Sequence, residues 1–169
     1  MQKINPRISI YIASLIFFLV SCTNTGDNAV SYNEKIVLSY EKVASLEDRL
    51  MFYILKNDSV NFDTCYIDFL NQIEVSKTEI KNLGAYNEYS EFQEAALQML
   101  EMYKNKAADR LVELMNFMKG GKEEGMGSGI NGDFFELKLF ELDSIIEEEF
   151  ERFENQQKKF AEMFGFVLM

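Results

Sequence analysis

The sequence predicts an all-α fold, in which an N-terminal signal helix precedes an antiparallel four-helix bundle in up-down-up-down order. Three observations predict it. The only proline, Pro6, lies close to the N-terminus, so no proline interrupts helices in the remaining chain. Apolar residues recur three and four positions apart in four successive segments, which is the pattern of packed helices. The period-two alternation typical of β-strands is absent after the N-terminal region.

The first two helices are expected at residues 29–56 and 61–83. The apolar side of the first is formed by Ile36, Val37, Tyr40, Val43, Leu46, Leu50, Tyr53 and Ile54. The sequence KNDS then predicts a tight reversal. The second helix carries its seam at Phe62, Tyr66, Phe69, Ile73, Ser76, Ile80 and Leu83. Gly84 follows in the position of a left-handed helix stop.

The third helix is expected to open at Ser90, because Ser90 and Gln93 have the spacing of a capping box. Its apolar side continues through Phe92, Ala96, Leu100, Tyr103, Ala107, Leu111, Leu114 and Met118. Glycines 120 and 121 then end it. Acidic residues early in this helix and Lys119 at its end complement the helix dipole.

The fourth helix is expected to start at Asp133, with Glu136 completing a second capping box. Its apolar positions are Phe135, Leu139, Leu142, Ile146, Phe150, Phe153, Gln157, Phe160 and Phe164, before Gly165. Segments of similar length joined by short turns favour the up-down-up-down arrangement. The exception is residues 119–133, which hold six of the nine glycines and predict a mobile loop between the third and fourth helices.

The N-terminus has the layout of a secretory signal. Lys3 and Arg7 precede an apolar run at residues 8–20. As a helix this run would reach only about 20 Å, which is short for a membrane core of about 30 Å. The residues Leu-Val-Ser before Cys22 resemble the lipobox of bacterial lipoproteins. The resemblance implies that the signal is cut before Cys22 and that its thiol receives a diacylglycerol.

This resemblance defines the expected domains: a signal peptide at residues 1–21, a lipidated tether at 22–28 and the four-helix bundle at 29–169. Two or three acyl chains would anchor the protein stably to a bilayer, without a spanning segment. The location implied is the bacterial cell envelope. Thr23 follows Cys22 where an aspartate can retain lipoproteins in the inner membrane, so the outer membrane is favoured, on either its surface or its periplasmic face.

Charge argues against a nucleic-acid partner. The expected signal contains two of the 17 basic residues and none of the 28 acidic ones, so the remaining chain has a net charge of −13. Such a surface repels phosphate backbones. Once Cys22 is acylated, Cys65 is the only remaining thiol, so no intrachain disulfide can form. Beside an apolar stripe, Cys65 is expected to be a small, partly buried hydrophobic residue, with pairing or reactivity as the alternative.

Catalytic and cofactor sites are not expected. The chain has no histidine, which excludes an ordinary catalytic triad, a haem attachment motif and a Glu-x-x-His di-iron site. Gly127, Gly129 and Gly132 match GxGxxG, but a helix is expected where a dinucleotide site needs a strand. The column Asp143, Glu147 and Glu151 offers carboxylates to a divalent cation, yet a solvated acidic face is the preferred interpretation. We therefore expect no enzyme activity, no cofactor and no metal.

Two apolar features have alternative interpretations. Met99, Met102, Met115 and Met118 enrich the third helix beside many phenylalanines, and either fill the core or line a groove for a lipid or a partner helix. The apolar C-terminus, residues 164–169, either folds over one end of the bundle or contacts another molecule. Core filling is the preferred interpretation of the methionines.

The lipobox, the entry sequence VSYNEKIV at residues 30–37 and the all-helical remainder resemble a family of uncharacterised bacterial surface lipoproteins. That resemblance implies a fold and a location, and no activity. The leading hypothesis is a non-catalytic, lipid-anchored bundle that interacts with a protein partner or has a structural role. A carrier of small apolar ligands is the alternative, and a carboxylate-dependent hydrolase the third hypothesis.

Overall fold

The computed structural model describes residues 24–120 and 130–168. Its elements are α1 (Asn24–Lys56), α2 (Ser59–Leu83), α3 (Glu91–Met102), the π-helical segment η1 (Tyr103–Ala107), α4 (Ala108–Gly120) and α5 (Ile130–Phe164). The predicted all-helical fold is confirmed, since these residues contain no β-strand, only one isolated bridge between Tyr86 and Tyr89. Within the same residues, no helix is long and apolar enough to cross a membrane.

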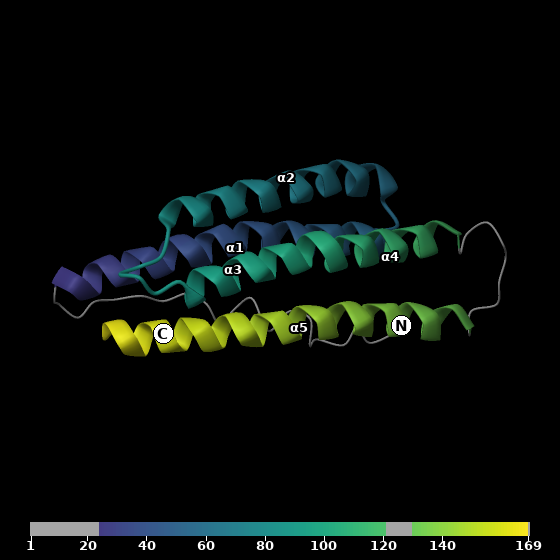
Figure 1. Ribbon diagram of the computed structural model, residues 1–169. Coiled ribbons are helices and arrows are strands. Elements are labelled where there is room, and N and C mark those ends of the chain that lie inside the picture. The colour runs from purple at the N-terminus through teal and green to yellow at the C-terminus, as the bar shows by residue number, and fades with distance from the viewer. Residues whose placement is uncertain (1–23, 121–129, 169) are drawn as a thin grey trace.

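The helices lie side by side as an elongated bundle, in which α3, η1 and α4 form one continuous rod (Figure 1). Two hydrogen bonds identify the two ends of the bundle. At one end the Tyr32 hydroxyl in α1 donates to the carbonyl of Gly84 after α2, at 2.7 Å. At the other end the Asn57 amide after α1 donates to the carbonyl of Met118 in α4, at 3.0 Å. We call the end with Tyr32 and the start of α1 the proximal end, and the end with Asn57 the distal end.

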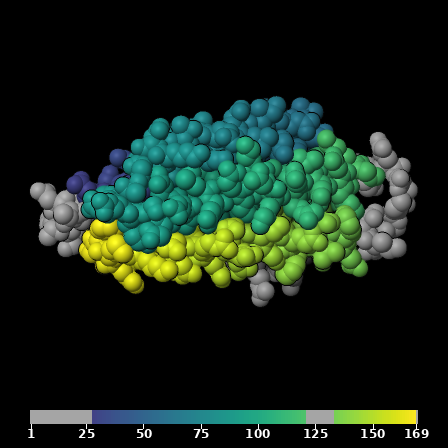
Figure 2. Space-filling view, in the orientation of Figure 1, coloured from purple at the N-terminus to yellow at the C-terminus, as the bar shows by residue number. Residues whose placement is uncertain are grey.

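The core is formed by the apolar sides that the sequence predicts. Fully buried side chains come from every helix, and the largest are Tyr103, Phe69, Phe92, Phe153, Phe160, Ile36, Leu50, Ile54, Ile73, Ile80, Met99 and Leu100. Met99, Met102 and Met115 are buried among them, which confirms core filling as their role. In the space-filling view α5 packs along the α3–α4 rod without a visible gap (Figure 2).

The first two helices start earlier than expected. Helix α1 begins at Asn24, so most of the predicted tether is helical, and α2 begins at Ser59. Because no proline interrupts these segments, adding residues to an existing helix is favourable. The predicted reversal lies at Asn57 and Asp58, where Asn57 has a φ of +53° and the Asp58 carboxylate accepts from the Asn61 amide. Gly84 has a φ of +67°, as its position predicts.

The capping boxes predicted for the third and fourth helices are wrong. The Ser90 hydroxyl donates to Glu94 at 2.7 Å and caps no amide, while the Gln93 amide donates to the Ile80 carbonyl of α2 at 2.8 Å. The tertiary partner competes successfully for the Gln93 side chain. Helix α5 begins at Ile130, so Asp133 lies inside its first turn. Its end is as predicted, with Gly165 at a φ of +73°.

The π-helical segment was not predicted from the sequence. Adjacent pairs of buried residues, Met102–Tyr103 and Ala107–Ala108, lie five positions apart. In a regular α-helix a residue five positions on is rotated by about 140° away from the same face. A wider π turn, closed by the Ala108 amide on the Tyr103 carbonyl, returns both pairs to the core.

Candidate functional site

The predicted lipidation residue, Cys22, lies outside the described residues, as do Gly127 and Gly129 of the glycine motif. Gly132 is in the first turn of α5. Helix α4 precedes the motif, where a dinucleotide site requires a strand.

Cys65 is buried in α2, as a small hydrophobic side chain is expected to be. Its thiol lies 3.8 Å from the carbonyl oxygen of Leu46 in α1. Burial raises the pKa of the thiol, and the nearby Arg49 only partly opposes this effect. A thiol that is buried and protonated is a poor nucleophile.

The predicted solvated acidic face on α5 is confirmed. Asp143, Glu147 and Glu151 are all exposed. Along the same helix Glu148 pairs with Arg152 at 3.7 Å and Glu154 with Lys158 at 3.3 Å. In the described part of the chain no three acidic or cysteine side chains gather in a way that would hold a metal ion.

One carboxyl group lies on the apolar side of α1 and is only partly exposed. Glu47 of α1 continues the apolar spacing of Tyr40, Val43, Leu50 and Ile54, and its side chain is only partly exposed. Burial, then the negative charges of Asp48 and Asp143, raise the pKa of Glu47 to about 8. Glu47 therefore holds its proton at neutral pH.

Two tyrosines lie near Glu47. Tyr103, the first residue of η1, is fully buried and shares a hydrogen bond with Tyr40 of α1. Their ring centroids are 6.2 Å apart, and burial raises the pKa of Tyr40 to about 12. The buried hydroxyl of Tyr103 is closed to substrates. The cluster therefore affects stability and its pH dependence, while the side chains of Glu47 and Tyr40 stay partly exposed.

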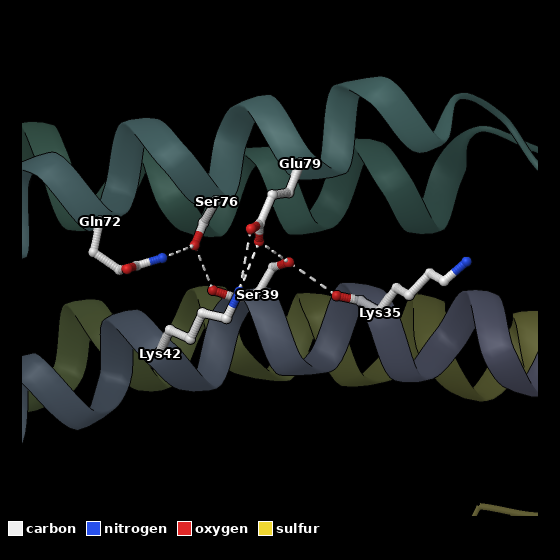
Figure 3. A network of polar contacts seen from close by, with 6 residues as sticks. All are labelled: Lys35, Ser39, Lys42, Gln72, Ser76 and Glu79. Atoms are coloured by element: carbon white, nitrogen blue, oxygen red, sulfur yellow. Dashed lines mark hydrogen bonds and ion pairs between the residues drawn. The ribbon is translucent and has the colours of Figure 1, made fainter.

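A polar network crosses between α1 and α2 (Figure 3). The Ser76 hydroxyl, fully buried, donates to the Ser39 carbonyl at 2.7 Å and accepts from the Gln72 amide at 3.1 Å. The Ser39 hydroxyl lies 2.9 Å from the Lys35 carbonyl and 3.0 Å from Glu79, either of which can accept its single proton. Small serine side chains let the two helices approach closely.

Ser39 and Glu79 are residue types found in catalytic sites that use a serine nucleophile and a carboxylate. They do not have the base strength or the accessibility that such a site requires. Hydrogen bonds from Lys42 and then Ser39 lower the pKa of Glu79, which makes its carboxylate a weak base. Ser39 is 4% exposed, so no substrate reaches its hydroxyl. We interpret the network as a clamp that fixes the register of α1 against α2.

A second buried polar contact fixes α1 against α5. The side-chain amide of Gln157 donates to the side-chain oxygen Oδ1 of Asn33 at 2.9 Å, and Asn33 is completely buried. The Asn33 amide nitrogen has no hydrogen-bond partner in the described structure. A buried polar pair of this kind favours one register over others, at some cost in stability.

The surface feature that stands out is apolar. Phe134, Leu137 and Phe140 are spaced three apart in the first half of α5 and are 46%, 52% and 69% exposed. We call them the α5 stripe. Phe134 packs on Phe117 of α4 at 5.1 Å between ring centroids, which places the start of the stripe at the distal end. Phe52 and Leu55, near the distal end of α1, are also exposed.

An open surface cleft lies at the proximal end. It has a volume of about 570 Å³ and is lined by Tyr89, Glu91, Gln156, Lys159, Glu162 and Met163. The residues belong to the segment before α3, to α3 and to α5. The cleft therefore presents charges of both signs beside an apolar side chain.

Sequence reasoning missed both Glu47 and the α5 stripe. The signal for Glu47 was present, because it occupies an apolar position between Val43 and Leu50. The signal for the stripe was three apolar residues outside the predicted apolar side of the fourth helix.

Comparison of the chain with protein-family models, with curated proteins and with solved structures finds no match.

Proposed function

We propose that this protein is a lipid-anchored, non-catalytic helical bundle of the bacterial cell envelope, which binds a partner protein through the exposed α5 stripe. Its four rods alternate in direction, up-down-up-down, from an anchor at Cys22. The distal end then points away from the membrane. The outer membrane is the favoured location.

The observation that carries the proposal is the stripe itself. Two exposed phenylalanines and an exposed leucine follow one another at a regular spacing on α5, and exposed apolar surface on a protein otherwise rich in acidic residues marks interaction sites. A helix face with anchors at regular spacing suits an apolar helix or groove on a partner. A partner with basic residues around its apolar contact would match the net charge of the chain.

A non-catalytic role is supported by the chemistry of the polar groups. Ser39, Ser76, Tyr103 and Cys65 are buried, and Glu79 is a weak base. The carrier hypothesis receives less support, because rings such as Phe92, Phe153 and Phe160 pack on each other at 5.2 to 5.4 Å in the interior.

The anchor is tested by replacing Cys22 with serine. A hydroxyl cannot form the thioether, so we expect the variant to incorporate no labelled fatty acid and to accumulate as uncleaved precursor. Cys65→Ser is the matched control, since that thiol is buried, and it should be labelled like the parent protein. Labelling of the Cys22→Ser protein would refute the anchor.

The partner site is tested by placing a photo-crosslinking amino acid at Phe140 in cells. We expect a discrete heavier product after irradiation, because Phe140 is the most exposed residue of the stripe. The control is the same substitution at Ile67 of α2, an apolar residue of similar exposure at 61%. Equal product patterns at both positions would contradict a specific site on α5.

A further inference from the structure

We propose that the proximal end of the bundle lies directly against the bilayer surface, with Met163 and Val167 entering the lipid interface. This inference rests on the proposed anchor at Cys22. It adds a second contact with the membrane, made by the opposite end of the chain. The occupant of this apolar surface is therefore a lipid surface.

The proposed anchor at Cys22 is close in sequence to the start of α1. Helix α1 begins at Asn24, so only Thr23 separates Cys22 from the helix. Ala29, the sixth residue of α1, is already completely buried in the bundle. The helix from Asn24 to Ala29 spans about 8 Å at about 1.5 Å per residue, and the two positions from Cys22 to Asn24 can reach at most about 7 Å even when fully extended. An anchor at Cys22 therefore holds that level of the bundle within about 15 Å of the bilayer.

The C-terminal segment also lies at the proximal end of the bundle. Tyr86, in the connection between α2 and α3, packs on Phe164 of α5 at 4.8 Å between ring centroids. The Phe166 amide donates to the Ala161 carbonyl, and its ring packs on Phe160 at 5.8 Å. The start of α1 reaches the same cluster through Tyr32, 5.4 Å from Phe160. The C-terminal segment therefore folds back over the bundle end.

Apolar side chains remain exposed at the proximal end. Val167 is 79% exposed and Met163 is 59% exposed. Tyr89 lines one cleft with Met163, Tyr86 packs on Phe164, and both tyrosines are partly exposed. Tyrosine is enriched at membrane interfaces, where its apolar ring contacts the acyl chains and its hydroxyl contacts headgroups and water. Exposed apolar residues next to partly exposed tyrosines form the combination expected at a lipid interface.

The charges around Met163 favour a zwitterionic surface. The cleft that Met163 lines also contains Lys159 and the acidic residues Glu91 and Glu162. The lysine suits a headgroup phosphate, and the carboxylates suit a headgroup ammonium group. A strongly anionic bilayer would be repelled by the rest of the acidic protein.

The test uses the acylated, processed protein in phosphatidylcholine vesicles, with the environment-sensitive fluorophore NBD on an introduced cysteine. Val167→Cys and Met163→Cys report the proximal end. Val60→Cys, at the start of α2, is the matched control, because Val60 is 76% exposed and lies at the distal end. The parent protein, with Cys65 buried, gives the background labelling.

Interfacial segments bury their apolar residues about 5–10 Å into the headgroup boundary, so we expect spin-labelled lipid to quench NBD at 163 and 167 about twofold more than at 60. Their emission should also shift to the blue. Equal quenching at all three positions, in protein that floats with the vesicles, overturns this inference alone. Protein that does not float with vesicles lacks the anchor, and overturns both proposals.

Discussion

Replacing Glu47 with glutamine is expected to stabilise the protein at pH 8 by about 2 kcal/mol, which raises the melting temperature by about 5 °C. The change keeps the size of the side chain and removes its charge. The expected gain is large because Glu47 is enclosed between helices, beside the carboxylates of Asp48 and Asp143.

The pH dependence of this gain has a defined sign. The pKa of Glu47 rises from 4.5 to about 8 on folding. Between these values the unfolded chain has released the proton and the folded chain retains it, so stability falls as pH rises through this window. The full shift corresponds to more than 4 kcal/mol at about 1.4 kcal/mol per unit, and partial exposure of the side chain offsets part of it.

Thermal unfolding from pH 5 to pH 9 measures this effect. The difference between Glu47→Gln and the parent protein should be small at pH 5, increase with pH and level off above pH 8. Glu136→Gln, at an exposed position of α5, is the matched control and should show no such trend. A Glu47→Gln curve parallel to the parent at every pH would show that Glu47 ionises as it does in water.

Replacing Phe160 with alanine is expected to destabilise the bundle by about 3–5 kcal/mol, through lost apolar burial and the cavity left behind. Phe160 is completely buried at the proximal end. Its ring lies within 6.0 Å, between centroids, of rings from each part of that end: Tyr32, Tyr86, Tyr89, Phe92, Phe164 and Phe166. One substitution therefore loosens the contacts between α1, α3, α5 and the C-terminal segment.

Chemical denaturation of the two variants Phe160→Ala and Phe140→Ala measures this cost against a matched control. Both remove the same atoms from α5, but Phe140 is 69% exposed, and a surface change is expected to stay within about 0.5 kcal/mol. A similar loss in both variants would mean that the aromatic cluster does not hold the proximal end together.

Helix periodicity was readable from the sequence because it depends on local properties. Apolar residues three and four apart predicted each helix, and Gly84 and Gly165 predicted two helix ends, since glycine adopts a positive φ without the steric cost that a Cβ atom adds. Helix starts were less predictable. The Gln93 side chain that would cap α3 instead binds the Ile80 carbonyl of α2, a partner that is distant in the sequence.

The π-helical turn has the same explanation. The predicted apolar positions of the third helix run three and four apart on both sides of Tyr103, so periodicity alone gave no reason to expect a wider turn. The wider turn allows two pairs of residues to be buried at once against α1, α2 and α5. Whether such a turn is needed depends on the positions of those helices. Local propensity has no information about such a requirement.

The sequence by itself determined the all-helical class, the core residues and the burial of Cys65, because these follow from the spacing and chemistry of neighbouring residues. Only the tertiary structure decided that Glu47 is enclosed among Tyr40, Tyr103 and Asp143, and that the phenylalanines of the α5 stripe stay exposed. Burial of a side chain depends on the position of the other helices, and that position is fixed by packing over the whole bundle.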